Sequence, residues 1–319
     1  MLFLAADIGG TRARLLLGRS HGDGWQPVRQ QTLASREHPD FASLLQAFLL
    51  PGERPLAACL ALAGPLDGER LRLTNLPWML DADALAGRFG LRRVQLLNDF
   101  AAQAHGLALL RPEQLCVLQP GAAQPDGVRA LLGAGTGLGM ALLAGTPAQP
   151  LVLPSEGGHA DFAPQDEQQL ALLRQLLARH ERVSLELLLS GRGLARLYAF
   201  LAGQPEDAAG LPDAAQISAA AAAGEALAGA TLELFARLYA AAAGNLALTG
   251  LARGGVYLCG GIAPKILPFL QRPAVREAFC AKPPMRALLE RIPLQVVLDE
   301  YLGLRGAAQV AARLAGPAD

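Results

Sequence analysis

Residues 1–17, MLFLAADIGGTRARLLL, contain two apolar runs on either side of the turn Asp7-Ile8-Gly9-Gly10-Thr11. Each run has the length of a β-strand, and a glycine pair between two strands is typical of a hairpin. Glycines leave backbone N–H groups uncovered, so an anionic oxygen can approach them closely. Thr11 adds a hydroxyl donor, and Asp7 places a carboxylate where it can hold a hydrated divalent cation. This turn is therefore either an ordinary hairpin or a site for a nucleotide triphosphate that carries Mg²⁺.

A second stretch, residues 131–144 (LLGAGTGLGMALLA), repeats the same design, and a third glycine pair, Gly260-Gly261, follows the apolar residues 256–259. Neither stretch is a Walker A loop, because no G-x-x-x-x-G-K-[ST] is present. Residues 133–139 are not a dinucleotide fingerprint either, since the spacing fails and a strand is expected after the turn. Two strand–glycine turn–strand units predict two related domains that each offer a phosphate-binding hairpin to a shared cleft.

The composition excludes several classes of protein. The 319 residues suit two domains that each bury a core. Lys+Arg and Asp+Glu number 28 each, so nothing favours nucleic acid as a partner. No uninterrupted apolar stretch reaches the roughly 18 residues of a membrane span, and the N-terminus lacks the basic region of a signal peptide. Four scattered cysteines without a C-x-x-C pair indicate buried thiols in a reducing compartment, so we expect a soluble cytoplasmic protein.

Strands and helices are expected to alternate, which favours an α/β fold. Residues 166–249 are expected to be mostly helical, with breaks near Gly224 and Gly244, and 150–164 to be an apolar lead-in followed by a polar loop. Besides the two hairpins, strands are predicted at 25–33, 55–63, 94–97, 115–118, 256–259 and 294–298, and helices at 41–50, 82–89, 100–110, 264–270, 275–279 and 303–314.

Several motifs resemble one family in order along nearly the whole chain. They are Asp7-Ile8-Gly9-Gly10-Thr11, Thr74-Asn75 with Trp78, Asn98-Asp99-Phe100, residues 133–139 (GAGTGLG), residues 156–164 (EGGHADFAP), Ser184 with Glu186, residues 189–191 (LSG), residues 244–248 (GNLAL) and Gly260-Gly261-Ile262. The chain resembles bacterial glucokinases of the hexokinase type. The combination of E-G-G-H-x-D-F with N-D-F is the most specific part of the resemblance.

The resemblance implies a two-domain actin-like ATPase (ribonuclease H-like) fold with a cleft between a small and a larger domain. The small α/β domain is expected to comprise residues 1–110 plus 300–319, and the larger domain, with its helical part, residues 111–299. It also implies ATP-dependent phosphorylation of D-glucose at the 6-hydroxyl, with Mg²⁺ as cofactor, by a homodimer. Small molecules are then the substrates, with no nucleic acid or membrane partner.

The resemblance also implies roles for individual residues. Asp99 becomes the base for the sugar hydroxyl, because phosphoryl transfer needs positioning, charge neutralisation and one proton acceptor. Glucose-binding roles fall on Asn98, Asp99, Glu156, His159 and Glu186. Asp7 is expected near Mg²⁺, through water. Nucleotide-binding roles fall on Ala6, Asp7, Ile8, Gly9, Gly10, Thr11, Gly135, Thr136, Gly137, Gly260 and Gly261.

Some alternatives stay open at this point. Glu156, His159 and Asp161 are also a possible set of metal ligands, although no further His or Cys lies nearby in the sequence. The other histidines are expected on the surface without partners: His21, His38, His105 and His180. The alternative functions are a kinase for another hexose, such as mannose or fructose, and a sugar-binding regulator without catalysis.

Arg12 departs from the family, in which asparagine usually follows Gly-Gly-Thr. A strand period of two places Arg12 and Arg14 on one face and the apolar residues on the other. Arg12 is then either a solvated residue beside the turn or a partner for phosphate oxygens or for the carboxylate of Asp7.

Overall fold

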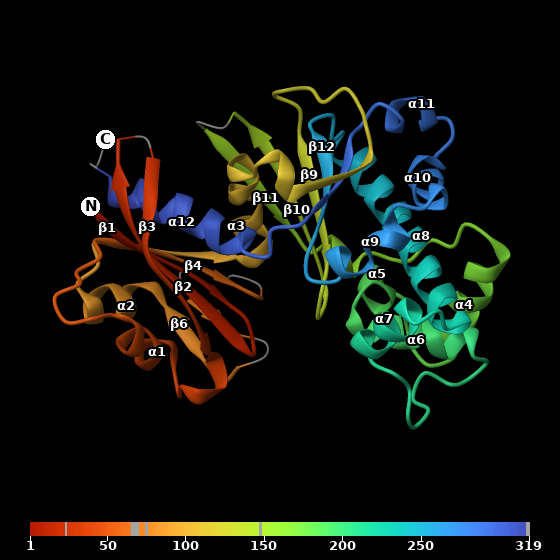
Figure 1. Ribbon diagram of the computed structural model, residues 1–319, viewed down its shortest axis with the longest axis horizontal. Helices are drawn as coiled ribbons and strands as arrows, with labels where there is room; N and C mark the ends of the chain where they lie inside the picture. The colour runs from red at the N-terminus through yellow and green to blue at the C-terminus, as the bar shows by residue number, and fades with distance from the viewer. Residues whose placement is uncertain (23, 65–69, 74–75, 147–148, 317–319) are drawn as a thin grey trace. The chain divides into compact units, whose positions relative to one another are not determined.

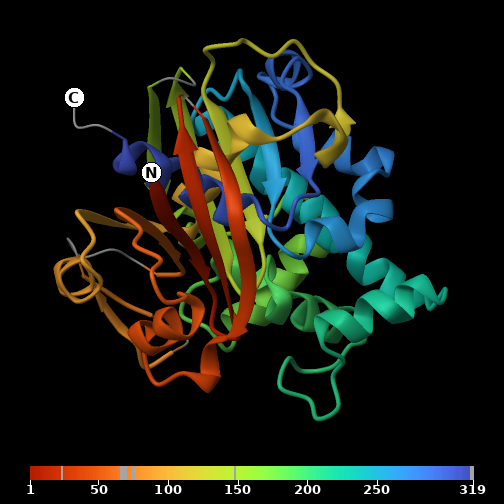
Figure 2. The same cartoon turned by 60° about the vertical axis from the view of Figure 1, so that its left-hand side comes forward.

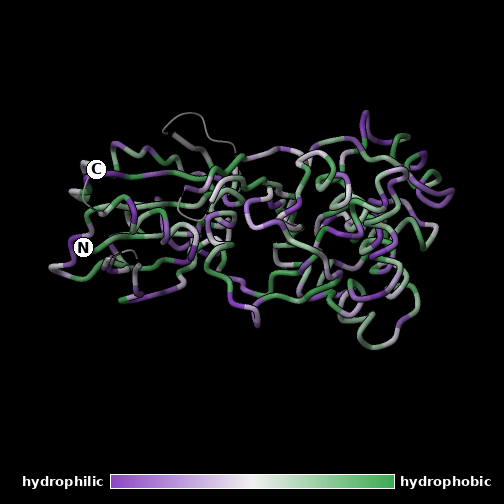
Figure 3. The backbone as a smooth tube through the Cα atoms, turned by 90° about the horizontal axis from the view of Figure 1, so that it is seen from above, coloured by the Kyte–Doolittle hydropathy of each residue, from purple (hydrophilic) through white to green (hydrophobic). Residues whose placement is uncertain are grey.

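The computed structural model describes residues 1–22, 24–64, 70–73, 76–146 and 149–316 (Figure 1). The chain divides into two compact units. Unit 1 comprises residues 1–111 and 301–319, and unit 2 comprises residues 112–300. Thr74 and Asn75 of the family motif lie outside the described residues. Along the tube in Figure 3, hydrophobic and hydrophilic segments alternate in both units, as buried strands and exposed turns require.

Unit 1 contains a five-stranded mixed sheet in the order β3-β2-β1-β4-β7. The first three strands form antiparallel pairs, whereas β1, β4 and β7 run parallel. A two-stranded sheet of β5 and β6 stands apart from it. The strands are β1 Leu2–Ile8, β2 Arg12–His21, β3 Gly24–Ala34, β4 Ala57–Leu62, β5 Arg70–Arg72, β6 Met79–Asp81 and β7 Arg93–Asn98.

Helices cover both faces of the five-stranded sheet of unit 1, because side chains alternate along each strand. Along β1, Leu4 and Ala6 pack with residues of α1 and α2, whereas Phe3 and Ala5 pack with residues of α12. Within the described residues, the α-helices of this unit are α1 Phe41–Phe48, α2 Ala82–Phe89, α3 Asp99–Gly106 and α12 Leu302–Ala315. Short 3₁₀ turns follow β3 and α3, at Ser35–Glu37 and Leu107–Leu109.

The C-terminal helix α12 belongs to unit 1. In Figure 2 its dark-blue ribbon lies beside the red strands from the start of the chain. Glycines allow the close contact between α12 and α3. A Cβ at Gly306 would lie 1.7 Å from the carbonyl oxygen of Ala102, and one at Gly106 would lie 2.5 Å from that of Leu302. Only a residue without a side chain fits at these two crossings.

Unit 2 is built on a six-stranded mixed sheet in the order β11-β10-β9-β12-β13-β8. The expected second hairpin is confirmed, since β9 and β10 pair antiparallel across residues 135–137. The strands are β8 Leu115–Gln119, β9 Arg129–Ala134, β10 Leu138–Gly145, β11 Pro150–Ser155, β12 Gly255–Cys259 and β13 Leu294–Val297. The helices are α4 Glu167–Leu177, α5 Leu185–Leu188, α6 Gly191–Leu201, α7 Ala214–Ala222, α8 Ala226–Thr249, α9 Leu267–Leu270, α10 Pro273–Cys280 and α11 Arg286–Leu289, with 3₁₀ turns at Pro112–Gln114, Gly157–His159 and Ala263–Ile266.

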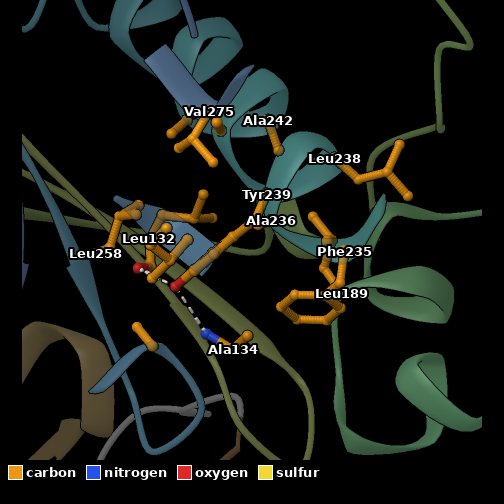
Figure 4. Packing of buried hydrophobic residues seen from close by; sticks show 14 of the residues in the cluster. Leu132, Ala134, Leu189, Phe235, Ala236, Leu238, Tyr239, Ala242, Leu258 and Val275 are labelled. Atoms are coloured by element: carbon orange, nitrogen blue, oxygen red, sulfur yellow. Dashed lines mark hydrogen bonds between the residues drawn. The ribbon is translucent and has the colours of Figure 1, made fainter. Parts of the chain in front are cut away.

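The long helix α8 forms the centre of the unit 2 core. Within the described chain it is the one helix long and apolar enough to cross a membrane, but 67% of its most apolar window is buried in the protein. Its alanines let α10 and the sheet approach closely, and Tyr239 points toward β9 and β12, whereas Phe235 lies beside Leu189 (Figure 4). This burial identifies α8 as a core helix.

One local prediction was wrong, and another is made more specific by the structure. We expected a break in the helix near Gly244, but α8 continues through it. A Cβ at Gly244 would lie 2.5 Å from the carbonyl oxygen of Phe279, so this glycine serves the packing against α10. The expected apolar lead-in of the 150–164 segment is the edge strand β11, which pairs antiparallel with β10.

Candidate active site

The first glycine turn, in unit 1, is closed by its own backbone. The N–H of Gly9 donates to the carbonyl oxygen of Arg12 (2.9 Å), so it is not available to a ligand. The hydroxyl of Ser35 donates to the carbonyl oxygen of Gly9 (2.9 Å), and the Ser35 N–H donates to that of Thr11 (3.0 Å). The N–H groups of Gly10 and Thr11 have no hydrogen-bond partner within the described residues. These two amides are left to meet an anionic oxygen.

Asp7 has a charged partner that sequence reasoning missed. Asp7 and Arg14 are cross-strand neighbours in the β1–β2 register, and Arg14 Nη1 lies 3.8 Å from Asp7 Oδ2. The Arg14 guanidinium also lies over the ring of Tyr301, 4.8 Å from its centre. Burial raises the pKa of Asp7 above its ordinary value. The positive charge of Arg14 acts in the opposite direction, but its effect is smaller. The signal in the sequence was that Asp7 and Arg14 lie equally far from the hairpin's midpoint, between Gly10 and Thr11.

Arg12, in contrast, is exposed and has no ion-pair partner among the described residues. The carboxylate of Asp7 is paired with Arg14, so the interpretation that Arg12 pairs with Asp7 was wrong. A hollow of about 280 Å³ opens beside the turn and is lined by Asp7, Gly9, Gly10, Thr11, Arg12 and Arg14.

Asn98 and Asp99 stand where β7 ends and α3 begins. Asn98 is the N-cap, and its side-chain oxygen accepts the N–H groups of Phe100 (2.9 Å) and Ala101 (3.3 Å). Asp99 Oδ1 accepts the Phe100 N–H as well (2.9 Å). The sequence suggested capping as the alternative role of Asp99, whereas the structure gives the N-cap position to Asn98, a residue type that commonly occupies it. Both side chains are half-buried, and the helix N-terminus favours a negative charge at Asp99.

The second glycine turn, in unit 2, is held by groups from outside its hairpin. The Gly135 N–H donates to the carbonyl oxygen of Gly137 (2.8 Å). The N–H of Leu138, at the start of β10, donates to Glu186 Oε2 (2.9 Å). The Gly191 N–H, at the start of α6, donates to the carbonyl oxygen of Gly135 (2.9 Å). The turn is therefore fixed from the side of α5 and α6.

A buried tyrosine fixes the base of the same turn. The hydroxyl of Tyr239 accepts the N–H of Ala134 (3.1 Å) and lies 2.9 Å from the carbonyl oxygen of Leu132 (Figure 4). It also lies 3.2 Å from the carbonyl oxygen of Cys259. Its side chain thus connects α8 to the ends of β9 and β12. Burial raises the pKa of Tyr239 far above its ordinary value, so the hydroxyl remains protonated.

The third glycine turn meets the second at Ala134. Gly260 has φ +82°, and a Cβ there would lie 2.6 Å from the carbonyl oxygen of Ala134. The Ile262 N–H donates to the same carbonyl oxygen (3.2 Å). Both the left-handed backbone and the close approach require glycine at 260. The structure therefore brings together the predicted residues 135–137 and 260–261.

Three of the predicted sugar-binding side chains gather beside the second turn. His159 Nε2 lies 3.8 Å from Glu156 Oε2, and His159 Nδ1 lies 4.0 Å from Glu186 Oε1. Glu156 and His159 are more than half exposed, whereas Glu186 is 35% exposed. One imidazole between two carboxylates gives donors and acceptors that suit the hydroxyls of a sugar.

The local backbone explains how these residues meet. Backbone hydrogen bonds join residues 160–162 to residues 183–185. The Leu185 N–H donates to the carbonyl oxygen of Ala160 (2.9 Å), and the Phe162 N–H donates to that of Val183 (2.9 Å). This short pairing places the loop that carries Glu156 and His159 against α5. A Cβ at Gly158 would lie 2.0 Å from the carbonyl oxygen of Leu138, so the glycine lets the loop touch β10.

Other predicted roles are corrected by their surroundings. His180 has a partner, Glu206 Oε1 at 2.7 Å, and was wrongly expected to have none. His105 is half-buried, and burial lowers its pKa, so it was also wrongly placed on the surface. Asp161 pairs with Arg182 (3.0 Å). Among the described residues no cluster of three or more His, Cys, Asp or Glu is arranged to hold a metal ion.

The family model described as glucokinase matches residues 4–314 of this chain. The chain belongs to the glucokinase family. A curated glucokinase from Nostoc punctiforme is 41% identical, with 98% of this chain and 99% of the relative covered. The crystal structure of a glucokinase from an Antarctic psychrotroph is similar with TM-score 0.87 at 34% identity, covering 98% of this chain and 99% of the other.

A glucokinase from Balamuthia mandrillaris, solved in complex with glucose, is similar with TM-score 0.80 at 25% identity, covering 98% of this chain and 93% of the other. These similarities extend along the whole chain. They confirm the family resemblance and the actin-like ATPase fold that the motifs predict.

Proposed function

We propose that this chain transfers the γ-phosphoryl group of ATP to the 6-hydroxyl of D-glucose and releases glucose 6-phosphate and ADP. Membership of the glucokinase family over residues 4–314 supports the enzyme class and the reaction. The observation that carries the proposal is the gathering of Glu156, His159 and Glu186 beside a glycine turn in unit 2. A set of sugar-binding side chains next to a phosphate-binding turn is what a sugar kinase requires.

In this proposal the chain contributes mainly positioning and one base, as phosphoryl transfer requires. Glu156, His159 and Glu186, together with Asn98, hold the sugar hydroxyls. The carboxylate of Asp99 accepts the proton of the 6-hydroxyl. The oxygen of that sugar hydroxyl bonds to the γ-phosphorus. The bond from the γ-phosphorus to the β,γ-bridging oxygen breaks, and ADP leaves. The free amides of the glycine turns meet the phosphate oxygens.

The residues beside the first turn fit a hydrated Mg²⁺. The Asp7 side chain is 25% exposed and borders the hollow at the turn, and Mg²⁺ typically takes one or two carboxylates while it keeps several waters. We propose that Asp7 holds the ion through water. When bound, the ion neutralises charge on the phosphates.

We also propose that the chain acts in the cytoplasm as a homodimer, with glucose and ATP as its small-molecule partners. Its balanced charge and the four cysteines, which are all unpaired thiols, support a reducing compartment and no nucleic-acid partner. Sedimentation equilibrium of the purified chain tests the homodimer, and a monomer at micromolar concentration would contradict it.

Asp99→Asn tests the central role. Asparagine keeps the shape and removes the basicity, so we expect kcat to fall by about 10²-fold or more, while glucose still binds. Asp83→Asn is the matched control, because Asp83 is an exposed aspartate in the first turn of α2 in the same unit. A coupled assay of ADP release measures both variants.

The same assay, run with glucose, mannose, fructose and N-acetylglucosamine, separates the candidate substrates. We expect the highest kcat/KM with glucose. A higher kcat/KM with another hexose would identify that hexose, and not glucose, as the substrate. If no sugar led to ADP release, the result would favour a sugar-binding regulator. If the Asp99→Asn variant turned over at a nearly normal rate, Asp99 would not be the base.

A further inference from the structure

Unit 2 has a second hollow at the end of its sheet that faces away from the glycine turns. This strand-end hollow, of about 220 Å³, is lined by Ala122, Gln124, Arg253, Leu288, Arg291 and Ile292. The lining segments follow β8 and precede β12 and β13, whereas the glycine turns follow β9 and β12. Because β9, β12 and β13 run parallel, the hollow and the turns lie at opposite ends of these strands. The five residues of β12 alone span about 16 Å, so the hollow is separate from the residues proposed for glucose and ATP.

Backbone hydrogen bonds hold the walls of the strand-end hollow together. The Ala122 N–H donates to the carbonyl oxygen of Arg291 (2.9 Å), and the Gln124 N–H donates to that of Arg253 (2.9 Å). The loop of residues 120–128 is therefore fixed to both segments that carry an arginine. Since main-chain atoms make these bonds, the two guanidinium groups are not used to build the hollow.

The turn that presents Arg253 contains a strained residue. Leu251 has φ +44° and is the one non-glycine residue with a positive φ in the part of the chain that the structure describes. It follows the end of α8, where glycine usually adopts this conformation. Bulky residues rarely do so, and such strained positions cluster at ligand-binding sites. The Arg253 N–H donates to the carbonyl oxygen of Leu251 (2.7 Å), so the strained turn fixes the backbone of this arginine.

The two arginines bring positive charge to the strand-end hollow without a balancing acid. Arg253 and Arg291 are exposed, and neither side chain has an ion pair or hydrogen bond within the described residues. Glu290, the acid next to Arg291 in the sequence, pairs instead with Arg286 (3.4 Å). Among the described residues that line the hollow, none is acidic. The hollow therefore attracts anions.

The chemistry of the lining indicates which anion fits. A guanidinium is a planar fork of donors that matches the oxygens of a phosphate group. Leu288 and Ile292 add apolar surface for a carbon body, and Gln124 adds an amide that can bond to a hydroxyl. The volume is below the roughly 300–1,000 Å³ of pockets for drug-sized ligands, so the body must be small.

We propose that the strand-end hollow is an anion site, outside the catalytic centre, that binds a small phosphate monoester through Arg253 and Arg291. The phosphate group lies between the two guanidinium groups, and a body of a few carbons covers the apolar surface. This site and the proposed phosphorylation of glucose use different residues, so either can fail in an experiment without the other.

Calorimetry with a ligand series is the first test. The unmodified protein is saturated with glucose, AMPPNP and Mg²⁺, which fill the proposed catalytic centre, and is then titrated with sn-glycerol 3-phosphate. We expect one molecule to bind per chain. Inorganic phosphate should bind about fivefold more weakly or less, because it has no carbon body to cover apolar surface, and glycerol should not bind. Absence of saturable binding of sn-glycerol 3-phosphate, or equal binding of inorganic phosphate, would overturn the proposal.

Arginine variants test the location of the site. Arg253→Met and Arg291→Met keep much of the side-chain length and remove the charge. Each should raise the Kd for sn-glycerol 3-phosphate by about tenfold or more, because a hydrogen bond between charged groups is lost. Arg174→Met is the control, since Arg174 is an exposed residue of α4 that does not line the hollow, and its Kd should not change. An unchanged Kd in both hollow variants, or an equal loss in the control, would contradict the proposal.

Amide hydrogen exchange gives a test that needs no variant and decides if the arginine variants do not fold. The ligand should stabilise the contacts of the 120–128 loop with the segments of Arg253 and Arg291. At about ten times the Kd of sn-glycerol 3-phosphate, exchange of the Ala122 and Gln124 amides through openings that release the ligand should slow about tenfold. If both amides exchange at their original rates when the protein is saturated, the ligand binds elsewhere and the proposal is wrong.

Discussion

The two glycine hairpins look alike in sequence but are held in different ways. In the first, β1–β2, the carboxylate at the turn is Asp7, which belongs to the hairpin itself and is balanced by Arg14 on the opposite strand. In the second, β9–β10, the turn is held by Glu186 and Tyr239, which come from α5 and α8. The first hairpin carries charged residues beside its turn, whereas the second has no charged residue at its turn and takes its restraints from distant helices. Two turns with similar sequences can therefore be held in place by different contacts.

The largest effect is expected from removing the charge of the first hairpin. Asp7→Asn should lower kcat by about 10²-fold, because charge that a metal ion neutralises in the transition state is worth several kcal/mol. It should also raise the Mg²⁺ concentration that gives half-maximal activity. Steady-state assays over a Mg²⁺ series measure both, with glucose affinity by calorimetry as the unaffected control. An unchanged Mg²⁺ requirement would mean that the charge of this hairpin does not serve the metal.

The next effect concerns the support of the second hairpin. Tyr239→Phe removes the hydroxyl that accepts the Ala134 N–H and leaves this buried group unsatisfied, so we expect a loss of about 1–3 kcal/mol in the free energy of unfolding. Urea denaturation measures it. Tyr198→Phe is the control, because its hydroxyl lies at the surface, 3.5 Å from Glu225, and should change stability by less than about 0.5 kcal/mol. Equal losses in both variants would contradict a special role for Tyr239.

A smaller effect is expected from the cross-strand pair. Arg14→Met removes a partly exposed ion pair and a cation–π contact, each worth about 1 kcal/mol or less, so we expect a loss of about 1 kcal/mol in the free energy of unfolding. Arg12→Met is the matched control two residues away on the same strand. It should stay within about 0.5 kcal/mol of the original protein. A larger loss in Arg12→Met than in Arg14→Met would reverse our assignment of the partner of Asp7.

The smallest effect is expected at Arg12 itself. If its guanidinium attracts the phosphates, Arg12→Asn should raise KM for ATP several-fold at low ionic strength and less at high ionic strength, because salt screens exposed charges. KM for glucose should not change. Initial rates at two salt concentrations test this. An unchanged KM for ATP at low salt would leave only the backbone of residue 12 with a role in the site.

The difference between the hairpins also explains what could be predicted from the sequence. The strands, the turns and Asp7 were predicted because each depends on residues within one hairpin. The contact between Leu138 and Glu186 spans 48 positions, and that between Ala134 and Tyr239 spans 105. No local sequence pattern can indicate contacts between residues so far apart along the chain. The family motif predicted Glu186 as a sugar-binding residue without revealing that one of its oxygens accepts a hydrogen bond from the turn.

The wrong prediction at Gly244 has the same origin. Glycine lowers helix propensity, so a break was a reasonable local expectation. In the fold, the absence of a side chain at this position lets α8 contact α10, and packing outweighs propensity. His180 and His105 were misplaced for a related reason, since neither the Glu206 partner nor the burial is visible in neighbouring residues.

The position of α12 bears on the order in which the chain folds during synthesis. The N-terminal sheet is made first, but Phe3, Ala5 and Cys59 on one of its faces are buried by a helix that ends at residue 315. Until residues 302–315 leave the ribosome, this apolar face has no cover, whereas every residue of unit 2 is already available to fold. Exposed apolar strands are prone to aggregation. We therefore expect unit 2 to complete its core before unit 1, and the nascent unit 1 to be more prone to aggregation.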